Sequence, residues 1–406
     1  MKIVILGASA NMAQPALRYL NAESLVEEIV LTDINEKRLK EIKYELGEKA
    51  SYEVVDVRDA SSLSAVMEGS QLVMNFVGPY FRFKTTALET AINSGVNYID
   101  LCDDYDVTLE ALQLDELARE KGVTAITGMG ASPGITNVLA KLGAEQLDKV
   151  DEINTYWIVG DAEPSGFGAL IHMFHIIKGK VPTFEDGKQT WIRSFQHTDS
   201  EVIDFGDPIG KVRLYPVGHP EPVTLPKYID GVKRVTNFGA LLPEFQNPMF
   251  KALVDLGLTS EEVIKFRGED VKPIDFLISL FSHKQEETAK HSKGESHPSV
   301  SGAKIEVIGE KKGNKVTYEF IKSAYDKMDQ GTSVPAGIAA SLLLKGVVKS
   351  KGVLAPEGLP IRELLSQLKE VGYFDEEKGF NVVRTIGSEA TSGNLTDKTK
   401  FNELWE

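Results

Sequence analysis

The sequence predicts an α/β protein in which a Rossmann domain, with a doubly wound parallel sheet, carries an inserted α+β domain with an antiparallel sheet. Three observations predict this fold class. Over residues 1 to about 127, short apolar runs alternate with helical stretches, which is typical of a parallel sheet covered by helices. After residue 150, the runs alternate apolar and polar residues, which indicates half-buried strands. The length of 406 residues also exceeds what a single core sustains, so two domains are expected.

The first strand, residues 3–6, stops at a glycine, and a helical pattern follows it. A helix that begins there directs free N–H groups and the positive end of its dipole at the turn, where a dinucleotide usually places its pyrophosphate. Small residues stand where further glycines are frequent, which still permits close phosphate approach. An ordinary strand-to-helix turn is the alternative. The cofactor-binding residues expected in this turn are Gly7, Ser9, Ala10, Asn11 and Met12.

The second strand, residues 28–32, ends at Asp33. This spacing suits an acid that binds the adenosine ribose hydroxyls, which favours NAD. Lys37 and Arg38 are close enough to pair with a 2′-phosphate instead, so NADP stays open. Asp33 could also serve only as a cap for the next helix.

The third and fourth strands end at further candidate cofactor contacts. Residues 52–55 lead to Asp56 and Val57, which are suitably placed to touch the adenine edge. Residues 71–77 lead to a Gly-Pro break at the carboxyl edge of the sheet, where the nicotinamide half is expected. The residues expected there are Asn75, Gly78, Pro79 and Tyr80.

The rest of the chain completes both domains. Residues 94–101 and 123–127 are the fifth and sixth strands, preceded by helices at 85–93 and 109–121. A helix at 135–147 is followed by strands at 153–159 and 211–217 and by a hairpin at 305–320 around Gly313 and Asn314. A small-residue helix at 334–347 should return to the first domain. The expected division is residues 1–130 with 333–375 for the cofactor domain, 131–332 for the substrate, catalytic and dimerisation domain, and 385–406 for a polar C-terminal tail.

Composition excludes several classes of function. The formal net charge of −15 disfavours binding to nucleic acid or to an anionic membrane. Apolar runs are too short for a signal peptide or a membrane-spanning helix. The single cysteine, Cys102, excludes an intrachain disulfide and fits a reducing compartment. We therefore expect a cytoplasmic protein with a small-molecule substrate, and a homodimer as the commonest symmetric assembly.

Several ordered segments resemble one protein family. They are GASANMA at 7–13, VMNFVGPYFRF at 73–83, YIDL at 98–101, ASPGITNVLA at 131–140, VPAG at 334–337 and GVLAPE at 352–357. In this order they resemble the saccharopine dehydrogenase family, in its saccharopine reductase and lysine 6-dehydrogenase branch. The resemblance implies a Rossmann domain with a returning C-terminal helix, an inserted catalytic domain, and NAD(P)-linked hydride transfer at a carbon bearing nitrogen in an amino acid or opine-type amine.

Oxidation of a C–N bond needs a neutral amine and a proton acceptor. Asp103 and Asp104 follow the fifth strand, at the edge of the sheet that binds ligand, and can attract an ammonium group. They are the first candidates for catalysis, with solvated loop acids as the alternative. His219 and Glu221, in a loop with prolines, are the second candidates.

Substrate contacts are expected from both domains. Tyr98 can line the nicotinamide pocket, although packing is the alternative. The helix start with Gly130, Pro133 and Asn137 suits a substrate carboxylate or the nicotinamide amide. Arg213 is a candidate for carboxylate recognition. Two further arginines of the second domain share this candidacy, Arg193 and Arg234.

Two motifs are interpreted as decoys. Tyr80 and Lys84 spell the Y-x-x-x-K pair of short-chain dehydrogenases but come too early in the chain. His172 and His175 share a helix face, but no acid or thiol lies nearby in the sequence, so no metal site is predicted.

Two functional alternatives stay open. One is a polyamine-pathway reductase resembling carboxynorspermidine dehydrogenase. The other is a non-catalytic NAD(P)-binding regulatory protein, since a fold does not establish an activity. Convergence of the acids and arginines on one cleft would favour an enzyme, and scatter would favour the regulator.

Overall fold

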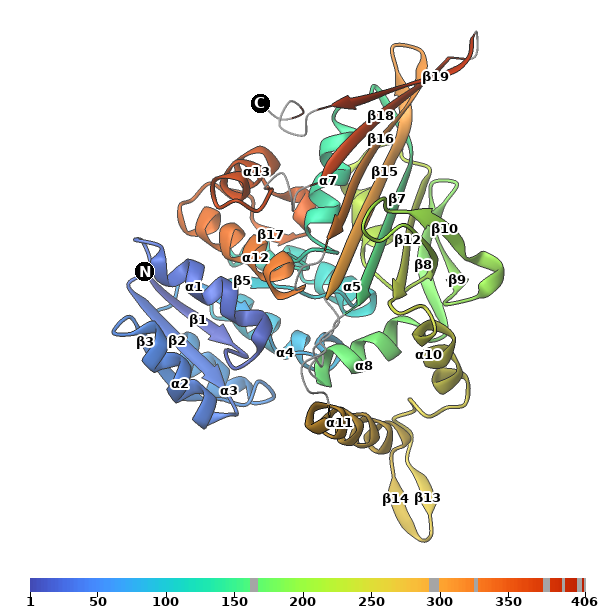
Figure 1. Cartoon of the computed structure of the whole chain (residues 1–406). Helices are drawn as coiled ribbons and strands as arrows, with labels where there is room; N and C mark the ends of the chain where they lie inside the picture. The colour runs from blue at the N-terminus through green and yellow to red at the C-terminus, as the bar shows by residue number, and fades with distance from the viewer. Residues whose placement is uncertain are drawn as a thin grey trace.

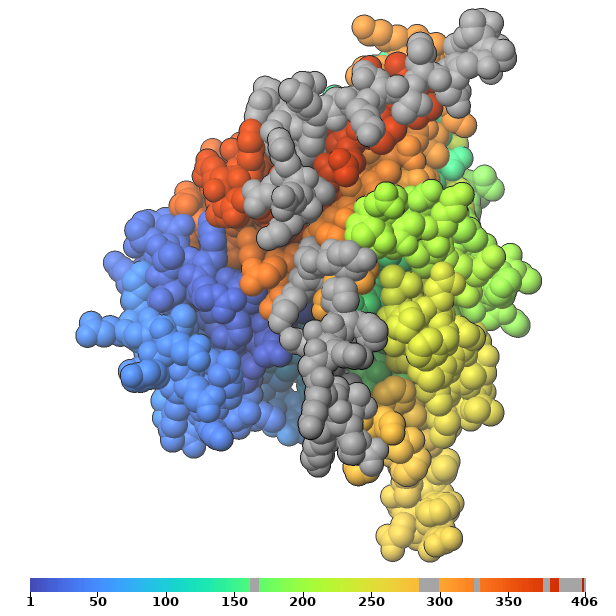
Figure 2. All heavy atoms as spheres, in the orientation of Figure 1, coloured from blue at the N-terminus to red at the C-terminus, as the bar shows by residue number. Residues whose placement is uncertain are grey.

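The computed structural model describes residues 1–160, 167–291, 299–324, 328–374, 380–388, 391–399 and 404. Figure 1 shows two bodies side by side, one built on a parallel sheet near the N-terminus and one built on a long, open sheet. The space-filling view separates the same two lobes (Figure 2). Within the described part of the chain, no helix is both long and apolar enough to cross a lipid bilayer.

The first body contains a seven-stranded, all-parallel sheet with the order β17-β6-β5-β4-β1-β2-β3. Six of these strands follow the order 3-2-1-4-5-6 of a dinucleotide-binding fold, which confirms the predicted fold class. The strands are β1 (Lys2–Leu6), β2 (Glu28–Asp33), β3 (Ala50–Val54), β4 (Leu72–Asn75), β5 (Asn97–Asp100), β6 (Thr124–Ile126) and β17 (Gly352–Leu354).

Helices cover this sheet on both faces (Figure 1). The predicted helix at 109–121 is two helices, because the Leu114 N–H bonds the Ala111 carbonyl in a tighter turn between them. The helices of this part are η1 (Asn11–Ala13), α1 (Gln14–Ala22), α2 (Glu36–Leu46), α3 (Ala60–Met67), α4 (Tyr80–Asn93), α5 (Tyr105–Gln113), α6 (Asp115–Glu120) and α7 (Ile135–Ala144).

The chain comes back to the first sheet near its C-terminal end. Helix α12 (Met328–Leu344) packs on α1, where a Cβ on Gly337 would lie 3.4 Å from the Ala16 Cα. The two helices therefore pack closely at this point. Strand β17 then pairs with β6, and η3 (Pro356–Gly358) and α13 (Ile361–Glu370) follow.

The second body contains a ten-stranded sheet that is mostly antiparallel, as predicted, although β7 and β12 pair in parallel. Its main order is β10-β11-β12-β7-β15-β16-β18-β19, with β8 joining β12 to β9. The strands are β7 (Lys149–Gly160), β8 (Lys180–Glu185), β9 (Lys188–Arg193), β10 (Glu201–Asp204), β11 (Lys211–Pro216), β12 (Arg234–Leu241), β15 (Val300–Lys311), β16 (Asn314–Ala324), β18 (Asn381–Ser388) and β19 (Thr391–Thr399). The shorter helices are α8 (Phe167–Ile176), η2 (His197–Asp199) and α9 (Glu221–Tyr228).

Two details of this sheet differ from the sequence predictions. The β15–β16 turn is formed by Lys312 and Gly313, one residue earlier than expected, because both take the positive φ that a two-residue hairpin turn needs. The polar tail expected at 385–406 is wrong for its first part, since β18 pairs with β16 and β19 pairs with β18. Main-chain hydrogen bonds hold such strands whatever their side chains, and Val382 and Phe380 anchor them in the core.

An arm projects from the second body (Figures 1 and 2). It consists of α10 (Gln246–Asp255), the hairpin of β13 (Ile264–Phe266) and β14 (Glu269–Val271), and α11 (Pro273–His291). Hairpin residues 261–270 are exposed throughout.

Candidate active site

The turn after β1 has the tight geometry expected of a dinucleotide cradle. Gly7 takes a φ of +74°, and a Cβ there would lie 2.9 Å from backbone atoms of Phe76 and Val77. The N–H groups of Gly7 and Ala8 both donate to the Thr32 carbonyl, which holds the turn against β2. Only a glycine fits this position.

The end of β2 faces this turn. The Asp33 carboxylate accepts hydrogen bonds from the Ser9 N–H at 3.2 Å and the Asn35 N–H at 3.0 Å. The Ser9 hydroxyl is buried and makes no hydrogen bond within the described protein. An orphaned hydroxyl, a glycine cradle and an oriented carboxylate fit a pyrophosphate and a ribose. Ala10, Asn11 and Met12 follow at the start of η1, where the first N–H groups of a helix have no intrahelical partner.

The residues at the end of β3 are occupied by contacts within the protein. The Asp56 carboxylate binds the Arg58 guanidinium, and these hydrogen bonds lower the pKa of Asp56 to about 2. Val57 is buried in the core of the first body. Asn35 caps α2, so Asp33 does not serve as the helix cap.

At the end of β4, a buried hydrogen-bonded group supports the expected nicotinamide loop. The Asn75 amide donates to the Tyr98 hydroxyl at 2.9 Å and accepts from the Val77 N–H at 2.9 Å. The Tyr80 hydroxyl donates to the Asn75 carbonyl at 3.1 Å. Tyr98 is fully buried, so it supports this loop from beneath. Beyond Pro79, the loop meets the second body.

Helix α8 of the second body closes on this loop. A Cβ added at Gly168 would lie 3.3 Å from the carbonyl carbon of Gly78, which leaves room only for backbone. The loop and the first turn of α8 therefore meet without a side chain between them. This contact brings the polar face of α8 to the carboxyl edge of the first sheet.

There, His172 of α8 lies between the two acids that follow β5. Its Nδ1 is 2.7 Å from Asp104 Oδ1, and its Nε2 is 3.1 Å from Asp103 Oδ2. Asp104 is fully buried and also accepts a hydrogen bond from the Phe81 N–H, at the N-terminus of α4. Nearby, His175 Nε2 lies 2.9 Å from Asp106 Oδ2. No acid was found near either histidine in the sequence, but the first body supplies acids that pair with both.

The charges in this group are strongly coupled. Burial opposes protonation of His172, but the negative charges of Asp103 and Asp104 outweigh it and raise the pKa of His172 to about 9. Burial likewise opposes ionisation of Asp104, yet the attraction of His172 lowers the pKa of Asp104. Burial raises the pKa of Asp103, although its side chain remains 32% exposed and His172 counteracts the shift. Near neutral pH, a cationic His172 therefore bridges two carboxyl groups.

A second buried pair lies beside the first. The His219 ring is stacked 5.1 Å from the ring of Trp157 and lies 5.9 Å from that of His172. His219 Nδ1 is 3.4 Å from Glu221 Oε2, close enough for attraction but not aligned as a hydrogen bond. Burial opposes ionisation of Glu221, but His219 outweighs it and lowers the pKa of Glu221. The structure thus brings together all four catalytic candidates.

Two residues of this site were not predicted from the sequence. His172 was dismissed because its acids are remote in the chain. Ser132 was missed, and its hydroxyl donates to Glu221 Oε1 at 2.6 Å. The ASPG segment was the available signal for Ser132, but only the fold shows that it faces Glu221.

The residues at the start of α7 have a structural role. Pro133 lies where Gly134 folds back, since a Cβ on Gly134 would lie 1.9 Å from the Gly130 carbonyl oxygen. Asn137 is fully buried, and the protein satisfies both ends of its amide. Its partners are the Gly134 N–H, the Thr136 and Thr224 hydroxyls and the Glu357 carboxylate. Asn137 therefore has no free position for a substrate.

The arginine candidates do not converge on the acids. Arg213 donates to the Ser200 hydroxyl at 2.8 Å, and Arg234 binds Glu185 at 3.2 Å. Arg193 is exposed on β9. Among described residues, these three side chains make no contact with the group formed by Asp103, Asp104, His172, His219 and Glu221, hereafter the acid–histidine cluster.

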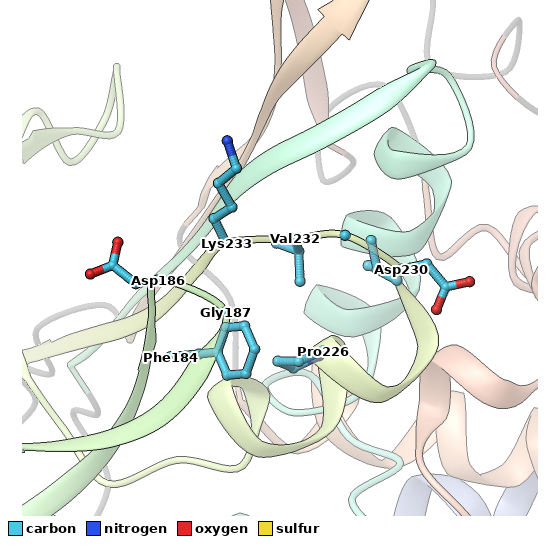
Figure 3. Close-up of a pocket in the computed structure, with 9 residues that line it drawn as sticks. Phe184, Asp186, Gly187, Pro226, Asp230, Val232 and Lys233 are labelled. Carbon is cyan, nitrogen blue, oxygen red and sulfur yellow. The ribbon is translucent and has the colours of Figure 1, made fainter.

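Two other features bear on ligands. Ligand atoms of Asp103, Asp104 and His172 lie within 4.8 Å of one another, a metal-like spacing, but each ring nitrogen already faces a carboxylate. A proton on His172 thus offsets one of the two carboxylate charges without a metal ion. A hollow of about 500 Å³ lies elsewhere, between the β8–β9 turn and the end of α9, with Phe184 and Pro226 on its walls (Figure 3).

Comparisons with known proteins identify the family of the chain. The model of the saccharopine dehydrogenase NADP binding domain matches residues 3–126, and that of the saccharopine dehydrogenase C-terminal domain matches residues 130–373. Carboxynorspermidine synthase of Vibrio alginolyticus is 24% identical over 377 residues, 85% of this chain and 86% of its own.

Two solved structures share the fold. Apo saccharopine dehydrogenase (L-Glu forming) from Saccharomyces cerevisiae has a TM-score of 0.67 at 15% identity, covering 95% of this chain and all of its own. Homospermidine synthase from Legionella pneumophila, in complex with NAD, has a TM-score of 0.57 at 10% identity, covering 100% of this chain and 96% of its own.

Proposed function

Because the chain belongs to the saccharopine dehydrogenase family and carries its NAD(P)-binding domain, we propose that it is an oxidoreductase acting on a carbon that bears nitrogen. One observation carries the proposal. A histidine from the second body is held between two acids at the carboxyl edge of the first sheet, next to the loop expected to meet the nicotinamide. Convergence of these groups favours an enzyme over a non-catalytic regulator.

The charge and exposure of each residue in the cluster indicate its role in the reaction. The Gly7 turn and Asp33 would hold NAD(P), which would supply the acceptor for the hydride. Asp103, partly exposed and with a raised pKa, attracts the ammonium group and accepts its proton, so that the nitrogen lone pair can form the C=N bond as the hydride leaves. Asp104 and His172 hold Asp103 in place, and the proton leaves through its exposed side.

The charge of the cluster bears on the substrate. We propose an amino acid or opine-type amine as the substrate class, with its nitrogen at Asp103. A polyamine is the second candidate. Two observations favour it: the arginines expected to bind a substrate carboxylate contact other groups, and a relative of 24% identity is a carboxynorspermidine synthase. Acids without a facing arginine suit a substrate that carries several ammonium groups.

For the cofactor, we propose a preference for NAD over NADP. The Asp33 carboxylate is oriented toward the glycine turn, where it would repel a 2′-phosphate. The Arg38 guanidinium, which could bind that phosphate, already lies 3.0 Å from Glu41 and 3.8 Å from Glu45.

We further propose that two copies of the chain associate through the arm. Exposed apolar side chains gather there, on Leu256, Val263, Ile264, Phe266 and Phe276. A lone two-stranded hairpin gains stability from a partner surface. The hairpin carries charges of both signs, which suits a self-complementary contact. The net charge and the single cysteine support a cytoplasmic protein without a nucleic-acid partner.

The test is a substrate screen that follows reduced nicotinamide by its absorbance. Basic amino acids, opines and polyamines are offered with NAD and with NADP, and each positive is repeated with His172→Asn. We expect turnover of at least one amine and about a tenfold loss in the variant. Nucleotide binding without turnover of any amine, opine or polyamine would contradict the proposal.

A further inference from the structure

Lys84 is a buried cation directly beneath the acid–histidine cluster. It lies on α4 with no exposed surface, and its Nζ donates to the Thr127 hydroxyl. The same Nζ is 3.4 Å from Asp100 Oδ2. Burial opposes protonation of Lys84, but the surrounding negative charge, that of Asp100 first, together outweighs burial and raises the pKa of Lys84. A buried ion pair is costly, and its retention calls for a reason.

The hydrogen bonds to the other Asp100 oxygen, Oδ1, give this reason. Asp100 Oδ1 accepts from the Cys102 N–H at 3.0 Å, the Thr127 hydroxyl at 3.1 Å and the Gly128 N–H at 2.9 Å. These donors lie on two different loops. One loop, after β5, carries Asp103 and Asp104, and the other, after β6, carries Ser132. One carboxylate thus joins both loops of the site.

We propose that Lys84 is a positioning residue for the acid–histidine cluster: it orients Asp100 and neutralises its charge, and Asp100 fixes the spacing of the two loops. Three carboxylates, those of Asp100, Asp103 and Asp104, lie within five residues of chain, and Lys84 offsets the charge of the first of them. Lys84 touches neither substrate nor cofactor in this assignment. Its effect on turnover rests on the proposed function, whereas its effect on geometry does not.

The experiment compares three variants: Lys84→Met, Asp100→Asn and the double variant. Each single change leaves a buried charge unpaired, whereas the double variant removes both charges and keeps an amide oxygen that can accept from both loops. The exposed Lys121→Met serves as the control. Folding is checked by thermal melting and NAD(P) binding by calorimetry. The wild-type protein is tested first for amine turnover.

Two readouts are expected. In Lys84→Met, turnover falls about tenfold at unchanged NAD(P) affinity, and the double variant recovers most of it. Independently of activity, the His172 imidazole titrates by NMR at a lower pKa in Lys84→Met than in the wild type, and its pKa returns in the double variant. Loss of the Lys84 cation should release Asp100 from its place between the two loops, so a lowered His172 pKa reports lost contacts with Asp103 and Asp104.

The outcomes separate the two proposals. Wild-type protein that oxidises no amine refutes the proposed function, while the His172 titration still decides the role of Lys84. An unchanged His172 pKa in Lys84→Met, or a double variant no better than the singles, overturns the positioning role. If Lys84→Met does not fold, the double variant decides: wild-type titration of His172 supports the role, and an altered one overturns it.

Discussion

At the scale of the residue, Asp103 differs from its neighbour by its exposure. Asp104 is fully buried and occupied by His172 and by the N-terminus of α4, whereas Asp103 keeps one side open. The two carboxyl groups can therefore perform different tasks, one as a fixed anion and one as an exchanging proton acceptor.

Asp103→Asn should lower turnover about tenfold and leave cofactor affinity nearly unchanged, because it keeps the size of the side chain but removes its charge and basicity. Steady-state kinetics on the best amine, with calorimetry of NAD(P), would measure both. Asp106→Asn is the matched control, since Asp106 also pairs with a histidine of α8 but is 40% exposed. Equal turnover losses in the two variants would contradict a special role for Asp103.

Asp33→Ala should weaken NAD binding more than NADP binding. The carboxylate that would bind the ribose hydroxyls is lost, and with it the charge that repels a 2′-phosphate. Calorimetric titration with each dinucleotide gives the ratio of affinities, and Asp56→Ala provides a comparison at the end of the next strand. A wild-type preference for NADP would refute the assignment.

At the scale of the element, local patterns predicted the first body well. Strands and helices alternate there from β1 to β6, so spacing alone placed Gly7, Asp33 and Asp103 at one sheet edge, although α12 and β17 return from the far end of the chain. The pairing of α8 with the β5–α5 loop was not predictable in this way. Asp104 and His172 are 68 residues apart, and nothing in either segment marks the other. The C-terminal strands were missed because their main-chain pairing does not need an apolar pattern.

The contact of α8 with that loop should make stability depend on pH. The pKa of His172 is raised to about 9, above its ordinary value of 6.5, so its contribution is complete below about pH 6.5 and is lost as pH rises through 9. Wild-type protein should therefore lose more thermal stability than His172→Asn between these values. The pKa of Asp104 is lowered, so its contribution is lost only on acidification. If the wild type and His172→Asn lost equal thermal stability over this pH range, the result would contradict the contact.

At the scale of the whole molecule, the site exists only where the two bodies meet. The cofactor turn and Asp103 belong to the first body, and His172, His219 and Glu221 belong to the second. The two halves match separate family models, whereas the proposed chemistry needs both at once. The arm touches the first body through the ion pair of Arg82 with Glu261, at 2.7 Å, but its apolar surface takes no part in the acid–histidine cluster.

Association through the arm gives the last prediction. Phe266 is 59% exposed and Ile264 is 51% exposed on a hairpin with no body beneath it, so two copies that cover these side chains would remove apolar surface from water. Phe266→Glu places a charge in that contact and should convert a dimer into a monomer in analytical ultracentrifugation. The control is Val202→Glu, at an apolar side chain of β10 that is 53% exposed outside the arm. A dimer that survives Phe266→Glu and dissociates with Val202→Glu would place the interface on the sheet instead.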